Sequence, residues 1–177
     1  MTVRPPLLHG FPPIVGGAPQ VLVLGNAPSV LALAKHQYYG NPRNAFWRIT
    51  GALYDFDADD PYPERTAALI AHGVAVWDVL RECRRAGSLD SAVEPASMVA
   101  NDFGPFFRRY PTIRRVLFNG AAAEKNFRRL VSGDFDVEFL RLPSTSPAQT
   151  MRYELKLAAW RAALQPLRQP SPRSEID

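Results

Sequence analysis

The fold is indicated by one short stretch near the start of the chain, Val21-Leu22-Val23-Leu24-Gly25-Asn26-Ala27-Pro28-Ser29. Its apolar residues stop abruptly at a turn that contains a glycine and a proline. Brief, nearly continuous hydrophobic runs of this kind are typical of strands buried on both faces of a parallel sheet. Three more runs end in polar or turn residues in the same way, and we predict a strand at each: Val74–Trp77, Val116–Phe118 and Val137–Leu140.

Helical patterns fill the segments between these runs, and we predict helices over residues 29–35, 44–54, 63–72, 102–109, 121–131 and 147–163. The last helix is the best marked, because Ser146 suits an N-cap, Pro147 suits the first helical position and Gln149 completes a capping box. Four residues recur at helical spacing and are predicted to form its buried face: Met151, Leu155, Ala158 and Ala162.

Strands that alternate with helices predict an α/β domain of three layers, α/β/α, around a central, mostly parallel four-stranded sheet. We expect a single domain over residues 1–177, a length that buries a substantial core. Residues 1–18 are rich in proline and glycine and are interpreted as an extended amino-terminal segment. Residues 165–177 are interpreted as a flexible tail.

The composition limits the partners and cofactors. The net charge of +4 is compatible with a polyanionic partner without requiring one. Cys83 is the only cysteine, which excludes an internal disulfide and any cluster that needs several thiolates. His9, His36 and His72 lack the spacing of metal ligands, so we expect no metal. Because no signal segment or membrane-spanning run is found, we expect a cytoplasmic protein with no membrane partner. We also expect a monomer.

The strand ends predict where a ligand binds. In open parallel sheets, ligands bind outside the carboxyl ends of the strands. This rule selects four segments that are far apart in the chain: Gly25–Ser29, Asp78, Asn119-Gly120 and Pro143–Gln149. We expect them to meet along one edge of the sheet.

Two of these regions resemble the two motifs of the uracil-DNA glycosylase superfamily. The first is Gly25–Ser29, followed by Tyr38-Tyr39-Gly40-Asn41-Pro42-Arg43-Asn44-Ala45-Phe46-Trp47. It looks most like the hypoxanthine-DNA (deoxyinosine) glycosylase branch, in which a Gly-x-x-Pro-Ser turn precedes Tyr-Tyr, Pro-Arg-Asn and Phe-Trp. The second is Leu142–Ala148, and with shorter similarities the resemblance covers about residues 10–160.

The resemblance implies a uracil-DNA glycosylase-like fold and a monofunctional DNA glycosylase. Such an enzyme flips a deaminated base, hypoxanthine or uracil, out of DNA and hydrolyses its N-glycosidic bond, which begins base excision repair. The implied partner is DNA containing deaminated bases, and no cofactor is expected because water is the nucleophile. The first turn is expected to bind the base through close approach of its backbone, and its members are Gly25, Asn26, Ala27, Pro28 and Ser29.

The resemblance also suggests a catalytic residue. Ala27 occupies the position at which many superfamily members have an Asp or Asn that orients the attacking water, and a methyl group cannot do so. The hypoxanthine branch relies instead on the Asn of Pro-Arg-Asn, which is Asn44 here. We expect Asn44 to position the water or the sugar; the alternative is that it only caps the following helix. Tyr39 matches a ring that stacks on the flipped base, with an ordinary buried tyrosine as the alternative.

Further residues are expected to read the base and hold the DNA. A carboxylate at Asp78 accepts a hydrogen bond from N1–H of hypoxanthine or N3–H of uracil, protons that adenine and cytosine lack; the alternatives are a helix cap or an Arg partner. We expect phosphate contacts from Arg43 and from the loop residues Ser144, Thr145 and Ser146.

Two departures from the superfamily pattern keep a second interpretation open. Leu142 replaces the usual His or Asn of the second motif, and Ala27 replaces the usual Asp or Asn of the first. A catalytically degenerate module that binds damaged DNA is therefore the alternative. A generic nucleotide-binding α/β protein is disfavoured, because Gly25–Ser29 matches neither a P-loop nor a Gly-x-Gly-x-x-Gly fingerprint. The choice between hypoxanthine, uracil, xanthine and thymine, the strand preference and the intercalating residue stay open.

Overall fold

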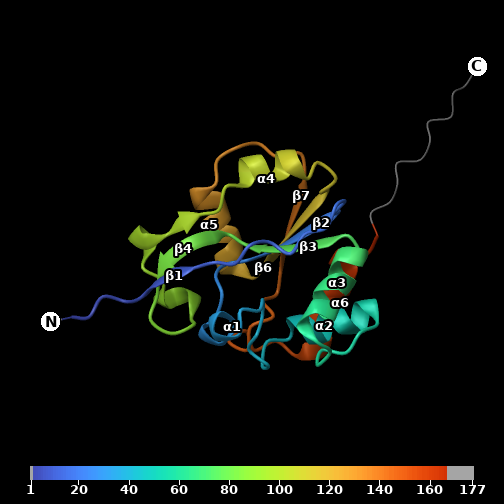
Figure 1. Cartoon of the computed structure of the whole chain (residues 1–177), viewed down its shortest axis with the longest axis horizontal. Helices are drawn as coiled ribbons and strands as arrows, with labels where there is room; N and C mark the ends of the chain where they lie inside the picture. Colours follow the sequence, from blue (N-terminus) through green and yellow to red (C-terminus); the bar gives the residue numbers. More distant parts are fainter. Residues whose placement is uncertain (1, 167–177) are drawn as a thin grey trace, which may run out of the picture.

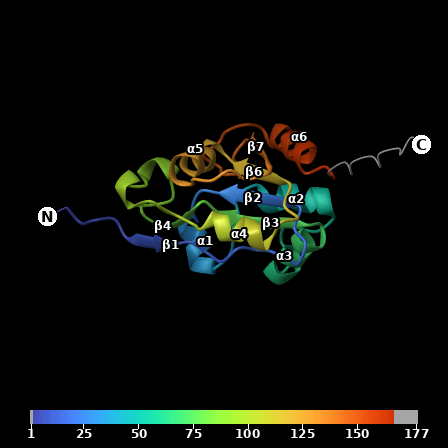
Figure 2. The same ribbon diagram turned by 90° about the horizontal axis from the view of Figure 1, so that it is seen from above.

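The central sheet has the four predicted strands. The structure, a computed structural model, describes residues 2–166, so nearly all of the tail expected at 165–177 lies outside the described residues. The strands are β2 (Val21–Gly25), β3 (Val74–Asp78), β6 (Arg115–Asn119) and β7 (Glu138–Leu142). They lie side by side in the order β3-β2-β6-β7, and every neighbouring pair is parallel (Figure 2). The prediction of a parallel four-stranded sheet is confirmed.

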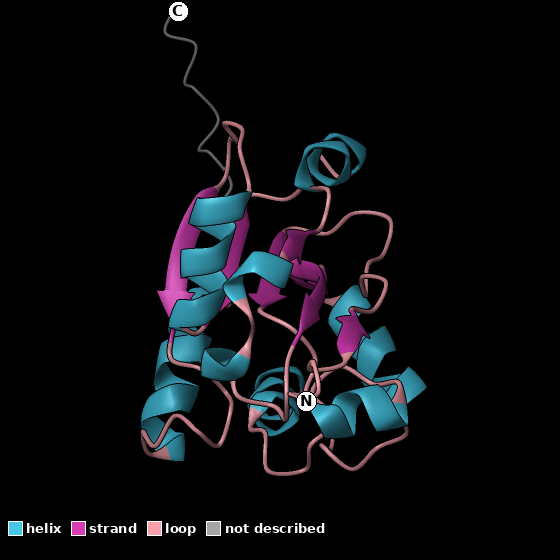
Figure 3. Ribbon diagram, turned by 90° about the vertical axis from the view of Figure 1, so that its left-hand side faces the viewer, coloured by secondary structure: helices cyan, strands magenta, loops and turns pink. Residues whose placement is uncertain are grey.

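Helices cover both faces of this sheet, which gives the expected three layers (Figures 1 and 3). One face carries α4 (Phe103–Arg109) and α5 (Ala121–Leu130). The opposite face carries α1 (Val30–Lys35), α2 (Phe46–Tyr54), α3 (Tyr62–Ala71) and α6 (Tyr153–Ala163). Within residues 2–166, no helix has both the length and the apolar character needed to cross a membrane.

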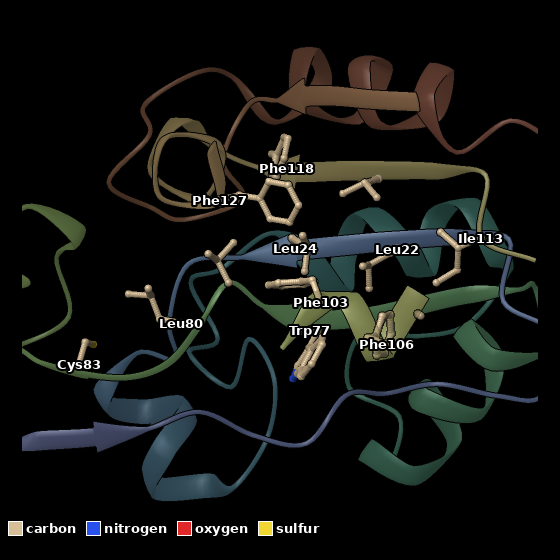
Figure 4. Packing of buried hydrophobic residues seen from close by; sticks show 14 of the residues in the cluster. Leu22, Leu24, Trp77, Leu80, Cys83, Phe103, Phe106, Ile113, Phe118 and Phe127 are labelled. Atoms are coloured by element: carbon tan, nitrogen blue, oxygen red, sulfur yellow. The ribbon is translucent and has the colours of Figure 1, made fainter. Parts of the chain in front are cut away.

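The strands β2 and β3 are buried throughout because both are covered on both sides. Leu22 and Leu24 of β2 belong to the apolar cluster that includes Phe103 of α4 (Figure 4). Val23, between them, belongs to the cluster on the other side, which includes Trp160 of α6. Successive side chains of a strand point to opposite faces, so a sheet between two helical layers needs apolar residues at every position.

A second, smaller sheet was not predicted. It is antiparallel and consists of β1 (Leu7–His9), β4 (Leu80–Arg84) and β5 (Val99–Ala100), in the order β1-β4-β5. The interpretation of residues 1–18 as lacking any element is therefore wrong at β1. A three-residue strand that is mostly exposed carries no hydrophobic run, and only its pairing with β4 defines it. Between β5 and β4 the chain forms two short 3-10 turns, Asp90–Ala92 and Pro95–Ser97.

The start and the buried face of the last helix also differ from the prediction. α6 begins at Tyr153 and not at residue 147, because Ser146 and Gln149 accept hydrogen bonds from the N–H groups two residues further on and make local turns in place of a capping box. The predicted buried residues Met151, Leu155, Ala158 and Ala162 are all exposed. The buried side chains are Lys156, Trp160 and Ala163.

The order of the strands determines where a site lies. From β2 the chain passes through α1, α2 and α3 to β3, and from β6 it passes through α5 to β7 on the other face. β2 and β6 are neighbours, so the connections diverge to opposite faces at their carboxyl ends. In open α/β sheets this divergence leaves a crevice for ligands.

Candidate active site

A cleft lies at this position. It collects residues from segments that the sequence separates widely: Gly25–Ser29, Ala32, Tyr38, Tyr39, Asn44, Asp78, Ser88, Asp90, Asn119 and Ser144–Ser146. Every residue predicted to bind the base, to catalyse or to hold DNA lines this cleft except Arg43, which is exposed outside it. The cleft is small, about 90 Å³; a hollow of about 680 Å³ adjoins it and shares Asp90, Ser144 and Ser146, and another of about 470 Å³ lies elsewhere. The small cleft is the candidate site because the polar residues from the strand ends converge on it.

Gly25 permits a close approach at the floor of the cleft. A Cβ atom at this position would lie 2.5 Å from Oδ1 of Asp78 and 2.9 Å from the hydroxyl of Tyr39. No side chain fits between these two groups. The last residue of β2 is therefore glycine because the tyrosine and the aspartate both reach the strand backbone there.

Two polar side chains of the first turn maintain its shape. Asn26 is buried: its Nδ2 donates to Oδ1 of Asp90 at 2.9 Å, and its Oδ1 accepts from Nδ2 of Asn126 in α5 at 2.8 Å. The hydroxyl oxygen of Ser29 accepts from the N–H of Ala32 at 3.1 Å and caps α1. Both residues line the cleft, but their side chains are engaged in holding the turn.

A buried arginine supports this turn from behind. Arg85 is 1% exposed; its Nη2 donates to the carbonyl of Pro28, and its Nε donates to the carbonyl of Gly87 at 2.7 Å. Burial lowers the pKa of Arg85, and the nearby Cys83 and Asp90 oppose that shift. The guanidinium thus joins the turn Gly25–Ser29 to the loop that follows β4.

Asn44 makes a local turn just before α2, whose N-cap is Ala45, and keeps a free amide. Its Oδ1 accepts from the N–H of Phe46 at 2.9 Å, at the start of α2. Its Nδ2 has no acceptor within residues 2–166, and the residue is half-buried against the cleft. The next residue, Ala45, donates its N–H to the carbonyl of Thr145 at 2.9 Å. The two motifs, far apart in sequence, are joined directly by this bond.

The second motif is fixed by the end of β6. Thr145 is 1% exposed; its N–H donates to Oδ1 of Asn119, and its hydroxyl accepts from Nδ2 of Asn119, both at 2.9 Å. Gly120 has a φ of +97°, and a Cβ there would lie 2.9 Å from Cβ of Ser144. Of the three serine and threonine residues predicted to contact phosphate, only Ser144 and Ser146 are partly exposed.

Lys156 of α6 holds the backbone of the second motif, and the sequence analysis did not select it. It is 4% exposed, and its Nζ donates to the carbonyls of Ser146 at 3.2 Å and Gln149 at 2.7 Å. Burial lowers the pKa of this ammonium group. In the predicted helix that starts at residue 147, position 156 falls outside the predicted buried face. The sequence pattern therefore indicated a solvent-exposed lysine.

Among the described residues 2–166, two buried polar atoms on the floor of the cleft have no hydrogen-bond partner. They are the hydroxyl of Tyr39 and Oδ2 of Asp78. The ring of Tyr39 stacks on Phe46, with centroids 4.2 Å apart, and its backbone has a φ of +53°, which is unusual for a residue other than glycine. Most buried polar groups are paired, so two adjacent exceptions mark a place where water or a ligand completes the hydrogen bonding.

The buried floor shifts the protonation of both groups. Burial raises the pKa of Asp78 to about 7; the carboxylate of Asp90 adds to this shift, and Arg85 opposes it. Burial also raises the pKa of Tyr39, so its phenol is neutral and able to donate a hydrogen bond. The neighbouring Tyr38 differs, since its hydroxyl donates to the carbonyl of Pro12 at 2.8 Å within the core.

Ser88 and Asp90 also line the cleft and were not anticipated. They lie in the loop after β4, which belongs to the small antiparallel sheet, so the rule of parallel strand ends does not reach them. The hydroxyl of Ser88 accepts from the N–H of Val30 at 2.9 Å. Gly87-Ser88 signals a turn in the sequence, but only the fold shows that this turn returns to the cleft.

The chain is similar to known proteins in sequence and in fold. Hypoxanthine DNA glycosylase of Methanosarcina acetivorans is 33% identical over 155 residues, 87% of this chain and 96% of the relative. The protein of the same name from Methanosarcina barkeri is 34% identical over 113 residues, 63% of this chain and 70% of the relative. A solution NMR structure of a candidate uracil DNA glycosylase from Methanosarcina acetivorans superposes with a TM-score of 0.75 at 31% identity, covering 89% of this chain and 96% of the other. The family match spans residues 12–168, and the chain belongs to the uracil DNA glycosylase superfamily.

Proposed function

We propose that this chain is a monofunctional DNA glycosylase that removes hypoxanthine from DNA. The observation that carries the proposal is the convergence of Tyr39, Asn44 and the loop at Ser144–Ser146 on one cleft at the sheet edge. Membership of the superfamily supports DNA glycosylase chemistry, and two relatives named hypoxanthine DNA glycosylase support the choice of base. The base must leave the duplex to enter such a cleft, so the proposal includes base flipping.

Recognition of the base is assigned to the floor of the cleft. The carboxylate of Asp78 accepts the N1–H of hypoxanthine, a proton that adenine does not carry at N1. Its Oδ2 is buried without a partner, and such an atom gains more from a hydrogen bond than an exposed one. The edge of the base lies beside Tyr39, whose ring stacks on Phe46. Uracil offers an equivalent N3–H, so its removal at a lower rate is consistent with the same floor.

The hydrolytic step is assigned to Asn44. Cleavage breaks the bond between the sugar C1′ and the base nitrogen, and the oxygen of a water molecule forms the new bond to C1′. One proton of that water ends on the departing base, which leaves an abasic sugar and free hypoxanthine. The free Nδ2 of Asn44 donates to the water oxygen and holds it against C1′, which is catalysis by positioning.

The departing base gains negative charge as the bond breaks. At the start of the second motif Leu142, 8% exposed, provides no hydrogen-bond donor from its side chain. The neutral hydroxyl of Tyr39 is buried on the cleft floor beside Asn119 and meets no acceptor within hydrogen-bond geometry in residues 2–166, so it is the donor that we assign to this charge. This assignment compensates for one of the two departures from the superfamily pattern.

One observation favours a second function, a module that binds damaged DNA without cutting it. The Oδ1 of Asn44 is engaged by the N–H of Phe46, so the side chain that should orient water is also a structural cap. In this alternative Asn44 only begins α2. The two functions share the cleft and differ in whether the glycosidic bond is broken.

The test is a single-turnover cleavage assay on labelled duplexes that contain hypoxanthine, uracil, xanthine or a G·T mismatch. We expect the hypoxanthine duplex to give alkali-labile sites fastest and an undamaged duplex to give none. Uracil released faster than hypoxanthine would change the assigned base. Tight binding without cleavage would select the binding module, and absence of both would reject either function. Protein carrying Asn44→Ala and purified in parallel controls for contaminating glycosylase.

A further inference from the structure

Two buried side chains of α6 hold the backbone of the second motif from the interior. Nε1 of Trp160 donates to the carbonyl of Pro143 at 3.0 Å. Nζ of Lys156 donates to the carbonyls of Ser146 and Gln149, at 3.2 and 2.7 Å. A carbonyl oxygen repels a phosphate, because both carry negative charge. These bonds therefore direct three repelling groups of the loop toward the interior of the protein.

The open side of the same loop offers hydroxyl groups. Oγ of Ser144 accepts from the N–H of Ser146 at 3.1 Å, and Oγ of Ser146 accepts from the N–H of Ala148 at 3.2 Å. A hydroxyl that accepts a hydrogen bond still has a proton to donate. Both serines line the cleft and the adjoining hollow, which Arg141 also borders. The loop thus presents donors to the cleft while its bonded carbonyls point inward.

Within residues 2–166, the ammonium group of Lys156 is a buried charge without a carboxylate partner. The residue is 4% exposed, and none of the ion pairs in this part of the chain includes it. A buried charge is costly unless an opposite charge compensates it. The two carbonyl dipoles that accept from Nζ compensate the charge only in part. A phosphate on the open side of the loop would add the missing negative charge.

We propose that Lys156 is a positioning residue for DNA binding. It fixes the second motif in the shape that binds phosphate, and it supplies a buried positive charge that a phosphate at Ser144 or Ser146 compensates. This inference rests on the DNA binding of the proposed function and does not require hydrolysis. Lys156 lies behind the loop and outside the cleft lining, so it acts on the affinity for DNA and not on the chemical step.

The experiment compares Lys156→Met with Lys125→Met. Lys125 is the matched control because it is an exposed lysine of α5 that lines neither the cleft nor the adjoining hollow. The Kd is measured for a duplex that contains 2′-fluoro-2′-deoxyinosine, in which the fluorine slows cleavage. We expect Lys156→Met to raise the Kd about tenfold at about 50 mM salt and only about threefold at about 300 mM, because salt weakens the attraction between the charge and the phosphates. The single-turnover rate of hypoxanthine release at saturating protein should fall less than about threefold. Lys125→Met should change the Kd less than about twofold at either salt concentration.

A second variant separates the charge from the hydrogen bonds. Lys156→Gln keeps a donor for the loop but is neutral, so it should show a salt-dependent loss of affinity close to that of Lys156→Met; it carries the test alone if Lys156→Met does not fold. An unchanged Kd in both variants, or a loss that is equal at the two salt concentrations, would overturn the role of Lys156 while leaving the glycosylase intact. Wild type that binds with this dependence on Lys156 but releases no hypoxanthine would overturn the proposed hydrolysis and retain the role of Lys156. Wild type that does not bind the duplex would overturn both.

Discussion

The polar residues of the cleft fall into two groups that differ in their hydrogen bonding. The frame consists of Asn26, Ser29, Asn119 and Thr145, whose side chains bond to other parts of the protein. The floor consists of Tyr39 and Asp78, each with a buried polar atom that has no partner within residues 2–166. Both groups were selected by the same sequence reasoning, yet only the structure separates them.

This difference teaches which residues serve the fold and which serve the ligand. A frame residue that is removed leaves a buried partner unsatisfied, which costs stability. A floor residue already lacks its partner, so its replacement by a less polar group should cost little stability and should change activity. Asn44 has one atom in each group, because its Oδ1 is bonded and its Nδ2 is free.

The largest effect is expected at Asn44. Asn44→Ala should lower the single-turnover rate of hypoxanthine release by about 10²-fold or more, because the positioned donor to the water is lost. Stability should fall by only about 1 kcal/mol, the usual cost of a lost cap. Asn41→Ala is the matched control, since Asn41 makes a similar bond to the N–H of Arg43 but does not line the cleft. A near-normal rate in folded Asn44→Ala would show that Asn44 serves only the fold, like the residues of the frame.

The next effect is on stability, at Asn119. Asn119→Ala removes both bonds to Thr145 and leaves a buried N–H unpaired, so the free energy of unfolding should fall by about 2–3 kcal/mol. Urea denaturation measures this loss. Ser144→Ala, which removes one local bond to the N–H of Ser146, should cost less. Equal losses in the two variants would contradict the role of Asn119 as the anchor of the loop.

A smaller effect is expected from the titration of Asp78, whose pKa is raised to about 7. If the carboxylate accepts N1–H, the rate of hypoxanthine release should fall about tenfold per pH unit below pH 7. Asp78→Asn offers an acceptor at every pH and should flatten the profile. A wild-type profile that is flat between pH 5 and pH 8 would contradict the assignment.

The titration of Asp78 affects stability in the direction opposite to its effect on the rate. An aspartate whose pKa is raised on folding stabilises the native state fully below its unfolded pKa, about 3.9, and loses that contribution as the pH rises through about 7. Wild type should therefore lose stability relative to Asp78→Asn between pH 4 and pH 7. Thermal unfolding of the two proteins across this range measures the difference.

The smallest effect is expected for Tyr39→Phe, which keeps the ring and removes the unpaired hydroxyl. Stability should change by less than about 0.5 kcal/mol, because no protein hydrogen bond is lost. The rate should fall about fivefold, through loss of the donor to the departing base. A stability loss of more than about 1 kcal/mol would show that this hydroxyl makes a stabilising hydrogen bond within the protein, as the residues of the frame do.

The sequence predicted the central sheet well because its signal is local. Val21–Gly25 and Val74–Trp77 are apolar throughout, as expected of strands that are buried on both faces. β1 left no such mark, since its three residues are a strand only through their pairing with β4. The last helix was mispredicted because Ser146-Pro147 resembles a helix start, while Trp160 packs fully buried and selects another face.

The site was predictable where it follows parallel strands and not elsewhere. Asp78 and Asn119 stand directly after hydrophobic runs, so their convergence with Gly25 follows from the sheet. Ser88 and Asp90 return to the cleft from the small sheet, and Lys156 reaches the loop from inside α6. Nothing in the local pattern distinguishes these three from surface residues. Bonding within the frame is also a property of three-dimensional partners, which residue types alone do not reveal.

The bond from Ala45 to Thr145 has a consequence for how the enzyme matures. It closes a very long loop of chain, and contacts of high sequence separation form late because the entropy of closing the loop must be overcome first. The first motif therefore acquires its shape only after β7 has paired at the far side of β6. A chain in which β7 has not yet paired already carries Asn44 but has no assembled cleft, so we expect its affinity for DNA to develop only once β7 is in place.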